Sequence, residues 1–271
     1  MTMVSTGSII MFLVNAVLGI AIPVFLAWWA VKKHNANLST ILIGAGTFLV
    51  FALMLESLVH RLVLSGPRGD AIQGNILYYA LYGGLMAGLF EETGRFLSMK
   101  YLMKKEPSDT KAAVSYGIGH GGVEMIVIFA LSMISLFVMA VMINAGQTDA
   151  LLSKTPAEAQ EQLSAQFEQL KTASAGTYLY ALWERFSALI LHVSLSILVW
   201  VAVRKGGKWL WLFPAAILLH ALVDGLAVIL SKSAGMFSIE LIVMALAIAF
   251  AGLAWLVARK AFPPIAGTTA G

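Results

Sequence analysis

Apolar residues form seven long runs along the chain, and short polar segments separate them. The runs lie near residues 8–31, 39–63, 75–103, 112–144, 177–203, 208–231 and 236–261. A helix needs about 20 apolar residues to cross a bilayer core of roughly 30 Å, and each run is long enough. The pattern predicts an all-α fold, a polytopic transmembrane bundle of about seven helices that forms a single membrane domain over residues 1–271.

Composition agrees with a membrane protein and excludes several kinds of site. Hydrophobic residues make up 59% of the chain and charged residues 12%, whereas roughly a quarter of an ordinary soluble domain is charged. The absence of cysteine excludes disulfides and thiolate zinc sites, so His, Asp or Glu would have to hold any metal. The net charge of +4 comes from basic residues at the ends of apolar runs, and we therefore expect no nucleic-acid partner.

Basic residues at the ends of the runs divide unevenly between the two sides of the membrane. One side has eleven: Lys32, Lys33, Lys100, Lys104, Lys105, Lys111, Arg204, Lys205, Lys208, Arg259 and Lys260. The other has five: Arg61, Arg68, Lys154, Lys171 and Lys232. The positive-inside rule makes the first side cytoplasmic. We expect an extracytoplasmic N-terminus and a cytoplasmic C-terminus, in a multi-pass protein of the cell membrane, the plasma membrane of a bacterium.

The long polar segment 147–175 is predicted to be an extracytoplasmic loop. Thr155 and Pro156 have the form of a helix start, with Thr155 as the N-cap and Pro156 at the first helical position. Apolar residues then recur at helical spacing: Leu163, Phe167 and Leu170. The loop is therefore expected to contain a short amphipathic helix, which is solvated, lies on the membrane or caps the domain.

Ionisable side chains interrupt four of the apolar runs. They are Glu91, Glu92 and Arg95 in the third run, His120 and Glu124 in the fourth, His192 in the fifth, and His220 and Asp224 in the sixth. Each charge deep in a bilayer costs roughly 2.5–3.5 kcal/mol on insertion scales, so a cluster of them indicates a function. Counted from the nearest cytoplasmic basic residue, Glu91, His120, His192 and His220 lie about 14–20 Å deep. Residues on four helices therefore share one level, and glycines near them would let the helices approach closely.

Histidines and carboxylates at one depth suit hydrolysis by an activated water molecule. The candidate ligands for a zinc-type ion are His120, Glu124, His192 and His220. Glu91 or Glu92 is the candidate general base, and the other carboxylate would pair with Arg95 because adjacent residues on a helix diverge by about 100°. A metal-free glutamate mechanism is equally compatible with the sequence. In that mechanism a Glu and a His activate water, while another His and Asp224 polarise the scissile carbonyl.

These motifs resemble those of a known group of intramembrane proteases. The segments that carry the resemblance are Glu91-Glu92-Thr93-Gly94-Arg95, Gly117 to Glu124, Trp183-Glu184-Arg185 with His192, and His220 to Asp224. They look most like the YhfC family of intramembrane metalloproteases, which is similar to the CAAX-prenyl protease and bacteriocin-processing family and to the PrsW family. The resemblance implies Glu91 or Glu92 as the catalytic base, His120 and His220 as water-activating or ligating groups, and a role for Asp224.

The sequence leaves three functions to be distinguished. The first is an intramembrane peptidase acting on a membrane-associated peptide or protein, with catalytic residues Glu91, Glu92, Arg95, His120, His220 and Asp224 and possible zinc dependence. The second is a divalent-cation or proton transporter, in which Glu56 and His60 extend the polar groups outward as an interfacial pair or gate. The third is a non-catalytic immunity or scaffold protein of the same fold. The lipid bilayer is a partner in all three, and the substrate and oligomeric state are not predicted.

Overall fold

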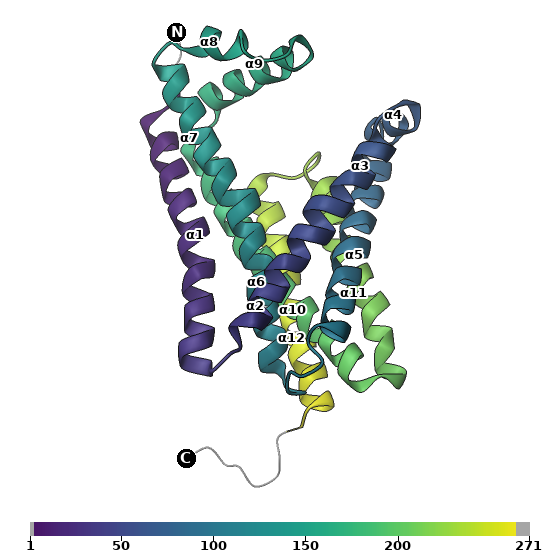
Figure 1. Ribbon diagram of the computed structural model, residues 1–271. Helices are drawn as coiled ribbons and strands as arrows, with labels where there is room; N and C mark the ends of the chain where they lie inside the picture. The colour runs from purple at the N-terminus through teal and green to yellow at the C-terminus, as the bar shows by residue number, and fades with distance from the viewer. Residues whose placement is uncertain (1–2, 264–271) are drawn as a thin grey trace. The chain divides into compact units, whose positions relative to one another are not determined.

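The computed structural model describes residues 3–263, except for the side chain of Glu158, and its regular elements are all helices (Figure 1). The elements up to residue 144 are α1 (Thr6–His34), α2 (Leu38–Phe48), η1 (Leu49–Glu56), α3 (Ser57–Leu64), α4 (Pro67–Gln73), α5 (Ile76–Tyr101), α6 (Thr110–Glu124), η2 (Met125–Ala130) and α7 (Leu131–Asn144). Those that follow are α8 (Thr148–Leu152), α9 (Ala157–Thr172), α10 (Ala175–Lys205), η3 (Gly207–Trp211), α11 (Leu212–Leu230) and α12 (Met236–Ala261). The predicted all-α class is confirmed.

Six helical stretches of the described chain are long and apolar enough to cross a membrane. They are Thr6–His34, Leu38–Leu64, Thr110–Asn144, Ala175–Lys205, Gly207–Leu230 and Met236–Ala261. Helix α5 has 26 residues, a length of about 39 Å, but it carries Glu91, Glu92 and Arg95 and is not one of the six. The predicted set of about seven helices thus consists of six apolar stretches and one polar helix. The chain is a multi-pass membrane protein.

Two of these stretches contain π-helical turns, which their hydrophobic pattern did not predict. Residues 39–63 and 112–144 were each predicted to be one membrane span. In the structure α2, η1 and α3 follow one another as a continuous rod, and η2 lies between α6 and α7 (Figure 1). The π segment η1 ends at Glu56, and η2 begins directly after Glu124. π-Helical turns within α-helices are frequent at functional sites, and both of these adjoin an ionisable residue.

Capping residues determine where several helices begin, and one predicted cap is wrong. Asn75 begins α5, because its side chain accepts hydrogen bonds from the backbone N–H groups of Leu77 and Tyr78 at 2.9 and 3.2 Å. Thr155 was expected to cap the helix in the loop. Instead Pro156 is the N-cap of α9, and the Thr155 hydroxyl donates to the carbonyl of Leu151 at 2.9 Å. The hydroxyl is satisfied by the end of α8, so it is not available to α9.

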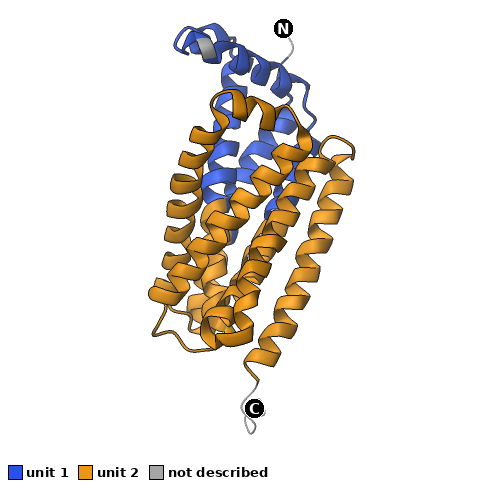
Figure 2. Ribbon diagram, turned by 90° about the vertical axis from the view of Figure 1, so that its right-hand side faces the viewer, with its two compact units in different colours: residues 1–22, 125–185 blue, residues 23–124, 186–271 orange. Residues whose placement is uncertain are grey.

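The described chain forms two compact units, shown in blue and orange in Figure 2. Unit 1 comprises Met1–Ile22 and Met125–Arg185. In its core Phe12 packs edge-on against Tyr178, with ring centroids 4.5 Å apart, and the Asn15 side chain donates to the Tyr178 carbonyl at 2.7 Å. Phe167 and Leu170 of α9 are buried in the same core. Helix α9 is therefore packed within unit 1 and is not a free solvated helix.

Unit 2 comprises Pro23–Glu124 and Phe186–Gly271 and contains the ionisable residues of α5, α6, α10 and α11. Its core includes Met99, Tyr116, Leu195 and Trp200, all nearly or fully buried. The Trp200 indole donates to the Asp109 carbonyl at 2.7 Å and ties α10 to the loop before α6. The predicted orientation refers to chain ends that lie outside the described residues, so it stays a prediction.

Candidate functional site

Four helices of unit 2 bring the predicted site residues together. Helix α5 contributes Glu91, Glu92 and Arg95, α6 contributes His120 and Glu124, α10 contributes His192, and α11 contributes His220 and Asp224. The imidazole rings of His120 and His192 have centroids 5.0 Å apart, and those of His192 and His220 are 5.5 Å apart. Glu92, Arg95 and His120 are completely buried. The eight residues form one cluster.

Glycines allow the helices that carry these residues to approach closely. A Cβ atom on Gly84 or Gly88 of α5 would lie 2.4 or 2.5 Å from a carbonyl oxygen of α11. A Cβ atom on Gly117 of α6 would lie 2.6 Å from the Cα atom of Val193 on α10. Real Cβ atoms do not come this close, so only glycine permits these spacings. The predicted role of these glycines in close packing agrees with the structure, whereas Gly83 faces open space.

Glu91, His192 and His220 form the centre of the cluster. One ligand-type atom from each lies within 4.8 Å of the other two, and all three residues are buried. Nδ1 of His192 is 3.8 Å from Oε2 of Glu91. Oε2 of Glu91 is also 2.9 Å from Nε2 of His120, so this carboxylate lies between histidines of two other helices.

Outer carboxylates orient the two central histidines. Glu92 Oε1 accepts a hydrogen bond from Nδ1 of His220 at 2.9 Å, and Glu124 Oε2 lies 2.5 Å from Nε2 of His192. A carboxylate bonded to one ring nitrogen fixes the orientation and tautomer of the imidazole, and in His220 it leaves the other nitrogen to act as a ligand or base. Asp224 Oδ2 is 3.5 Å from that other nitrogen of His220, Nε2.

Arg95 pairs with Glu92 and not with Glu91. One guanidinium nitrogen of Arg95, Nη1, donates to both oxygens of Glu92 at 2.8 and 2.9 Å. The other, Nη2, lies 3.2 Å from Nδ1 of His192. Because a guanidinium is always a donor, Nδ1 is the acceptor, and the proton of His192 is on Nε2 toward Glu124. The two neighbouring glutamates therefore have different partners: Glu92 holds Arg95 and His220, and Glu91 faces His120 and His192.

Comparison with known proteins identifies the family. The sequence model of the YhfC intramembrane metalloprotease family matches residues 18–248. The chain belongs to this family. It is also 36% identical over 260 residues to a Bacillus subtilis (strain 168) protein described as uncharacterized membrane protein YhfC, covering 95% of this chain and 98% of that protein. No solved structure matches the chain. The resemblance stated from the motifs is confirmed, and the matched residues include the whole cluster.

The donor set in this YhfC-family chain fits a zinc-type ion, provided that Nδ1 of His192 exchanges its hydrogen bond from Arg95 for the ion. Two imidazoles and one carboxylate with an open fourth position are a common catalytic zinc set, and hydrogen-bonded outer carboxylates are typical of such sites. Among the described residues, Glu91, His192 and His220 are the one group of three close enough to share an ion. Of the four predicted ligands, His192 and His220 belong to this group. His120 and Glu124 lie outside it: His120 hydrogen bonds with Glu91, and Glu124 makes an ion-pair contact with His192.

Two aromatic residues at the site were not predicted. The Tyr116 ring stacks on His120 with centroids 5.9 Å apart, and the Phe48 ring meets His120 edge-on at 5.3 Å. The Tyr116 hydroxyl hydrogen bonds with Ser98 at 3.0 Å. Tyr116 is four residues before His120, so helical spacing could have identified it. Phe48 comes from a distant part of the chain, and no local signal indicates its contact.

A second polar group joins η1 and α3 to α5. Nε2 of His60 is 3.1 Å from Glu56 Oε1, and Nδ1 of His60 is 2.9 Å from the Tyr82 hydroxyl. Glu56 is buried, and the charges of Glu91, His220 and Asp224 act on its carboxyl group. The pairing of Glu56 with His60 was expected from sequence. The contribution of Tyr82 was not, because it depends on how α3 meets α5.

Proposed function

We propose that this chain is an intramembrane peptidase that hydrolyses a peptide bond in a membrane-associated peptide or protein. The observation that carries the proposal is the convergence of Glu91, His192 and His220 inside a helical membrane protein. Membership of a family named for intramembrane metalloproteases supports the same reaction class. Buried charges are costly in a membrane, and a fixed group of ligands and proton acceptors gives a reason for retaining them.

Each residue of the cluster has a definable role in this proposal. Glu91, His192 and His220 would hold a zinc-type ion. Bound there, the ion would polarise the scissile carbonyl and make a water molecule more acidic. Glu92 and Glu124 orient the two histidines through their second ring nitrogens. Arg95 neutralises Glu92, and His120 holds the Glu91 carboxylate in place.

Asp224 is the proposed proton acceptor. Its side chain is 39% exposed, against 9% for Glu91 and 13% for Glu124, so it is the most exposed carboxylate of the cluster. It also lies next to Nε2 of His220. In this position it takes the proton of the attacking water and returns it to the leaving amine, so no net proton is consumed.

The same residues allow a metal-free route, which the sequence left open. Here Glu91, held by Nε2 of His120, takes the proton from water, while His220 and Asp224 polarise the carbonyl. Both routes require the Glu91 carboxylate. They differ in their dependence on metal, so chelation distinguishes them.

Cleavage of membrane-anchored peptides in proteoliposomes tests the proposal. We expect the wild type to cleave members of a peptide library, and Glu91→Gln to lower kcat/KM by roughly 10²–10⁴-fold, the usual contribution of such a group. Glu161→Gln, the same change at an exposed position of α9, should retain full activity. A cooperative thermal unfolding transition in each variant would show that both are folded.

The outcomes of these measurements separate the alternatives. A wild type that cleaves no peptide, or Glu91→Gln with unchanged cleavage, contradicts the proposal. Loss of activity on chelation and recovery with Zn²⁺ supports the metal route, and full activity under chelation supports the glutamate route. Metal flux into the same proteoliposomes without cleavage would favour the transporter.

A further inference from the structure

We propose that Glu56, His60 and Tyr82 line a water inlet that leads from one face of the membrane to Glu91. The inlet supplies the water molecule that hydrolysis of each peptide bond consumes, and this assignment of its cargo rests on the proposed peptidase function. It opens at the end of unit 2 where α3 ends and α5 begins, two segments that lie side by side (Figure 1). The positive-inside rule predicts that this end is extracytoplasmic.

The three side chains form a hydrogen-bonded group that joins three helical segments. The His60 imidazole bridges Glu56 of η1 and Tyr82 of α5, with contacts of 3.1 and 2.9 Å. His60 and Glu56 lie four and eight residues before the end of α3, and Tyr82 lies six residues after the start of α5. At about 1.5 Å per residue, His60, Tyr82 and Glu56 are roughly 6, 9 and 12 Å from the ends of these helices. The group therefore extends inward from one membrane face.

The cluster continues this polar series toward the centre of the membrane. Asp224 and His220 lie six and ten residues before the end of α11, roughly 9 and 15 Å from it. Glu91 lies 15 residues after the start of α5, roughly 22 Å from it. The charges of these three residues act on the Glu56 carboxyl group, so the inner end of the inlet is within electrostatic range of the cluster. Polar side chains thus follow one another from the membrane face to Glu91.

Two ionisable side chains of this series are partly exposed, although they belong to membrane-spanning helices. The Asp224 side chain is 39% exposed and the His60 side chain 31%. Contact of a carboxylate with hydrocarbon is costly, and such groups face the interior of a bundle or a water-filled space. The exposed surfaces of Asp224 and His60 are therefore assigned to water and not to lipid.

On the opposite side of the cluster, an apolar core blocks the way to the other membrane face. The side chains of this core are at most 1% exposed and include Met99, Tyr116, Leu195, Leu198 and Trp200. The helical segments between the cluster and the basic residues at that face contain no Asp, Glu, Lys, Arg or His: residues 96–99 of α5, 112–119 of α6 and 193–203 of α10. The inlet therefore ends at the cluster, whereas a transporter needs a pathway that continues to both faces.

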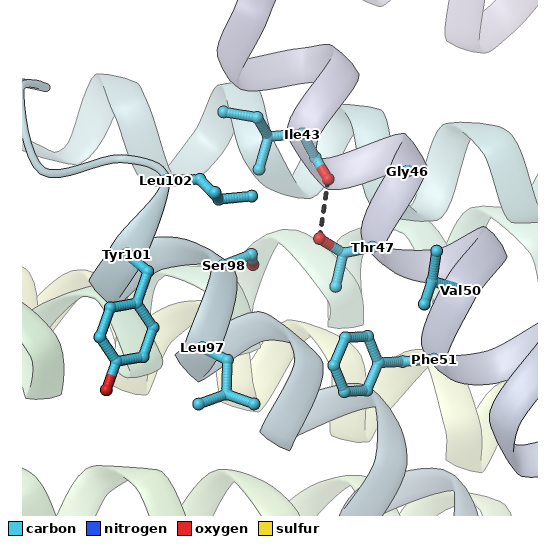
Figure 3. Close-up of a pocket in the computed structure, with 9 residues that line it drawn as sticks. All are labelled: Ile43, Gly46, Thr47, Val50, Phe51, Leu97, Ser98, Tyr101 and Leu102. Atoms are coloured by element: carbon cyan, nitrogen blue, oxygen red, sulfur yellow. Dashed lines mark hydrogen bonds between the residues drawn. The ribbon is translucent and has the colours of Figure 1, made fainter.

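Two apolar grooves beside α5 offer water no alternative route. The groove between α2/η1 and α5 has a volume of about 470 Å³, no charged side chain lines it, and its Thr47 hydroxyl is bonded to the Ile43 carbonyl (Figure 3). Phe51 closes it off from Glu91 by packing against Gly94, where a Cβ atom would lie 2.5 Å from Cγ of the ring. The groove between α5 and α11, of about 330 Å³, is lined only by Leu, Ala, Gly and Ile residues. Apolar cavities of this kind stay dry.

Introduced thiols test the inlet, because the chain has no cysteine of its own. Glu56→Cys and Tyr82→Cys each place one thiol in the inlet. The matched controls are Leu58→Cys and Leu81→Cys, which lie about 3 and 1.5 Å nearer the same membrane face by the helix rise. Leu58 and Leu81 are 53% and 62% exposed, and Leu81 lines the apolar groove between α5 and α11. The reagent is a membrane-impermeant methanethiosulfonate, added in turn to intact cells and to inside-out membrane vesicles.

We expect the two inlet thiols to react at least about tenfold faster than the two controls, because thiolate is the reactive form and a thiol in apolar surroundings stays protonated. Depth and exposure alone predict the reverse order. The inlet thiols should react from the side opposite to that of Lys105→Cys, which marks the other end of unit 2 beyond α5. Modification of purified Tyr82→Cys should also abolish peptide cleavage, and reduction of the mixed disulfide should restore it.

Other outcomes overturn the inference. Equal reaction rates at the inlet and control positions would show that water does not enter between α3 and α5, while the peptidase function stands. Reaction of the inlet thiols from the same side as Lys105→Cys would contradict the proposed opening. Unchanged cleavage by fully modified Tyr82→Cys would exclude the inlet as the route of the hydrolytic water. Fast labelling in a protein whose wild type cleaves no peptide would keep the inlet and contradict the peptidase function, and with it the assigned cargo.

Discussion

Glu91 and Glu92 are adjacent in the chain but meet different partners in the structure. Residues next to each other on a helix diverge by about 100°, so both carboxylates cannot face the same group. The sequence therefore predicted that one would pair with Arg95 and the other would face the site. The partners are decided by the neighbouring helices: His220 of α11 lies beside Glu92, and His120 of α6 lies beside Glu91.

Removal of one partner from the buried pair of Glu92 and Arg95 should strongly destabilise the protein. Arg95→Leu leaves the Glu92 carboxylate buried without its guanidinium, and we expect the free energy of unfolding to fall by about 3–5 kcal/mol. The double variant Glu92→Gln with Arg95→Leu should recover part of this loss, because no unpaired charge remains. Denaturation in mixed micelles measures both changes. A loss in the double variant equal to the sum of the losses in Arg95→Leu and in Glu92→Gln alone would show that the pair is not coupled.

Metal content should depend on the two central histidines. We expect purified wild type to hold about one zinc-type ion per chain, and His192→Ala with His220→Ala to lose it, because a single carboxylate ligand is too few. His34→Ala changes an exposed histidine at the end of α1 and should leave the content unchanged. Elemental analysis of the purified proteins provides the measurement. Equal metal content in all three, or none in the wild type, argues against the proposed ligand set.

At the scale of elements, helix α5 combines a polar centre with close packing against its neighbours. Its charged residues lower its hydropathy below that of the six apolar stretches. Its glycines let the backbone of α11 approach closely. This close packing buries the charges among their partners and so offsets the cost of placing them in a membrane helix. Sequence alone showed the glycines and the charges. It did not show the π turns η1 and η2, because no residue type marks a change of hydrogen-bond register.

The contact between α2 and α6 should be sensitive to a single methyl group. Ala is normally a better helix former than Gly, but a Cβ atom on Gly119 would lie 1.9 Å from the Ile41 carbonyl oxygen. We therefore expect Gly119→Ala to destabilise the protein by about 1–3 kcal/mol through overpacking. Gly83→Ala, at a position of α5 that faces open space, should be neutral or slightly stabilising. Thermal unfolding in detergent compares them, and equal melting temperatures would contradict the close contact.

At the scale of the whole molecule, the eight cluster residues all belong to unit 2, although they span from Glu91 to Asp224 in the chain. Unit 1 contributes a separate core that includes α9. The sequence predicted one membrane domain and an orientation, and these stay predictions. The orientation has a direct test, because a chain without cysteine can be labelled at one introduced thiol.

We expect Glu161→Cys to react with a membrane-impermeant maleimide in intact cells, since segment 147–175 is predicted to be extracytoplasmic. Lys105→Cys, on the side with more basic residues, should react only after the membrane is disrupted. Both positions are exposed, so accessibility of the thiol within the fold does not limit labelling. The cysteine-free wild type is the control for background labelling. The reverse pattern would invert the orientation and place the cluster nearer the opposite face.

The sequence by itself determined the helical membrane class, the cluster residues and their common depth. These follow from hydrophobic run length, the cost of charge in lipid and the fixed rise of a helix, which are local properties. Tertiary structure decided which carboxylate faces which histidine. It also decided that Glu91, and not His120 or Glu124, joins the two central histidines in the candidate ligand group, and that Phe48 and Tyr82 contact their polar groups. These depend on the rotation and separation of helices far apart in the chain, which hydrophobic periodicity does not encode.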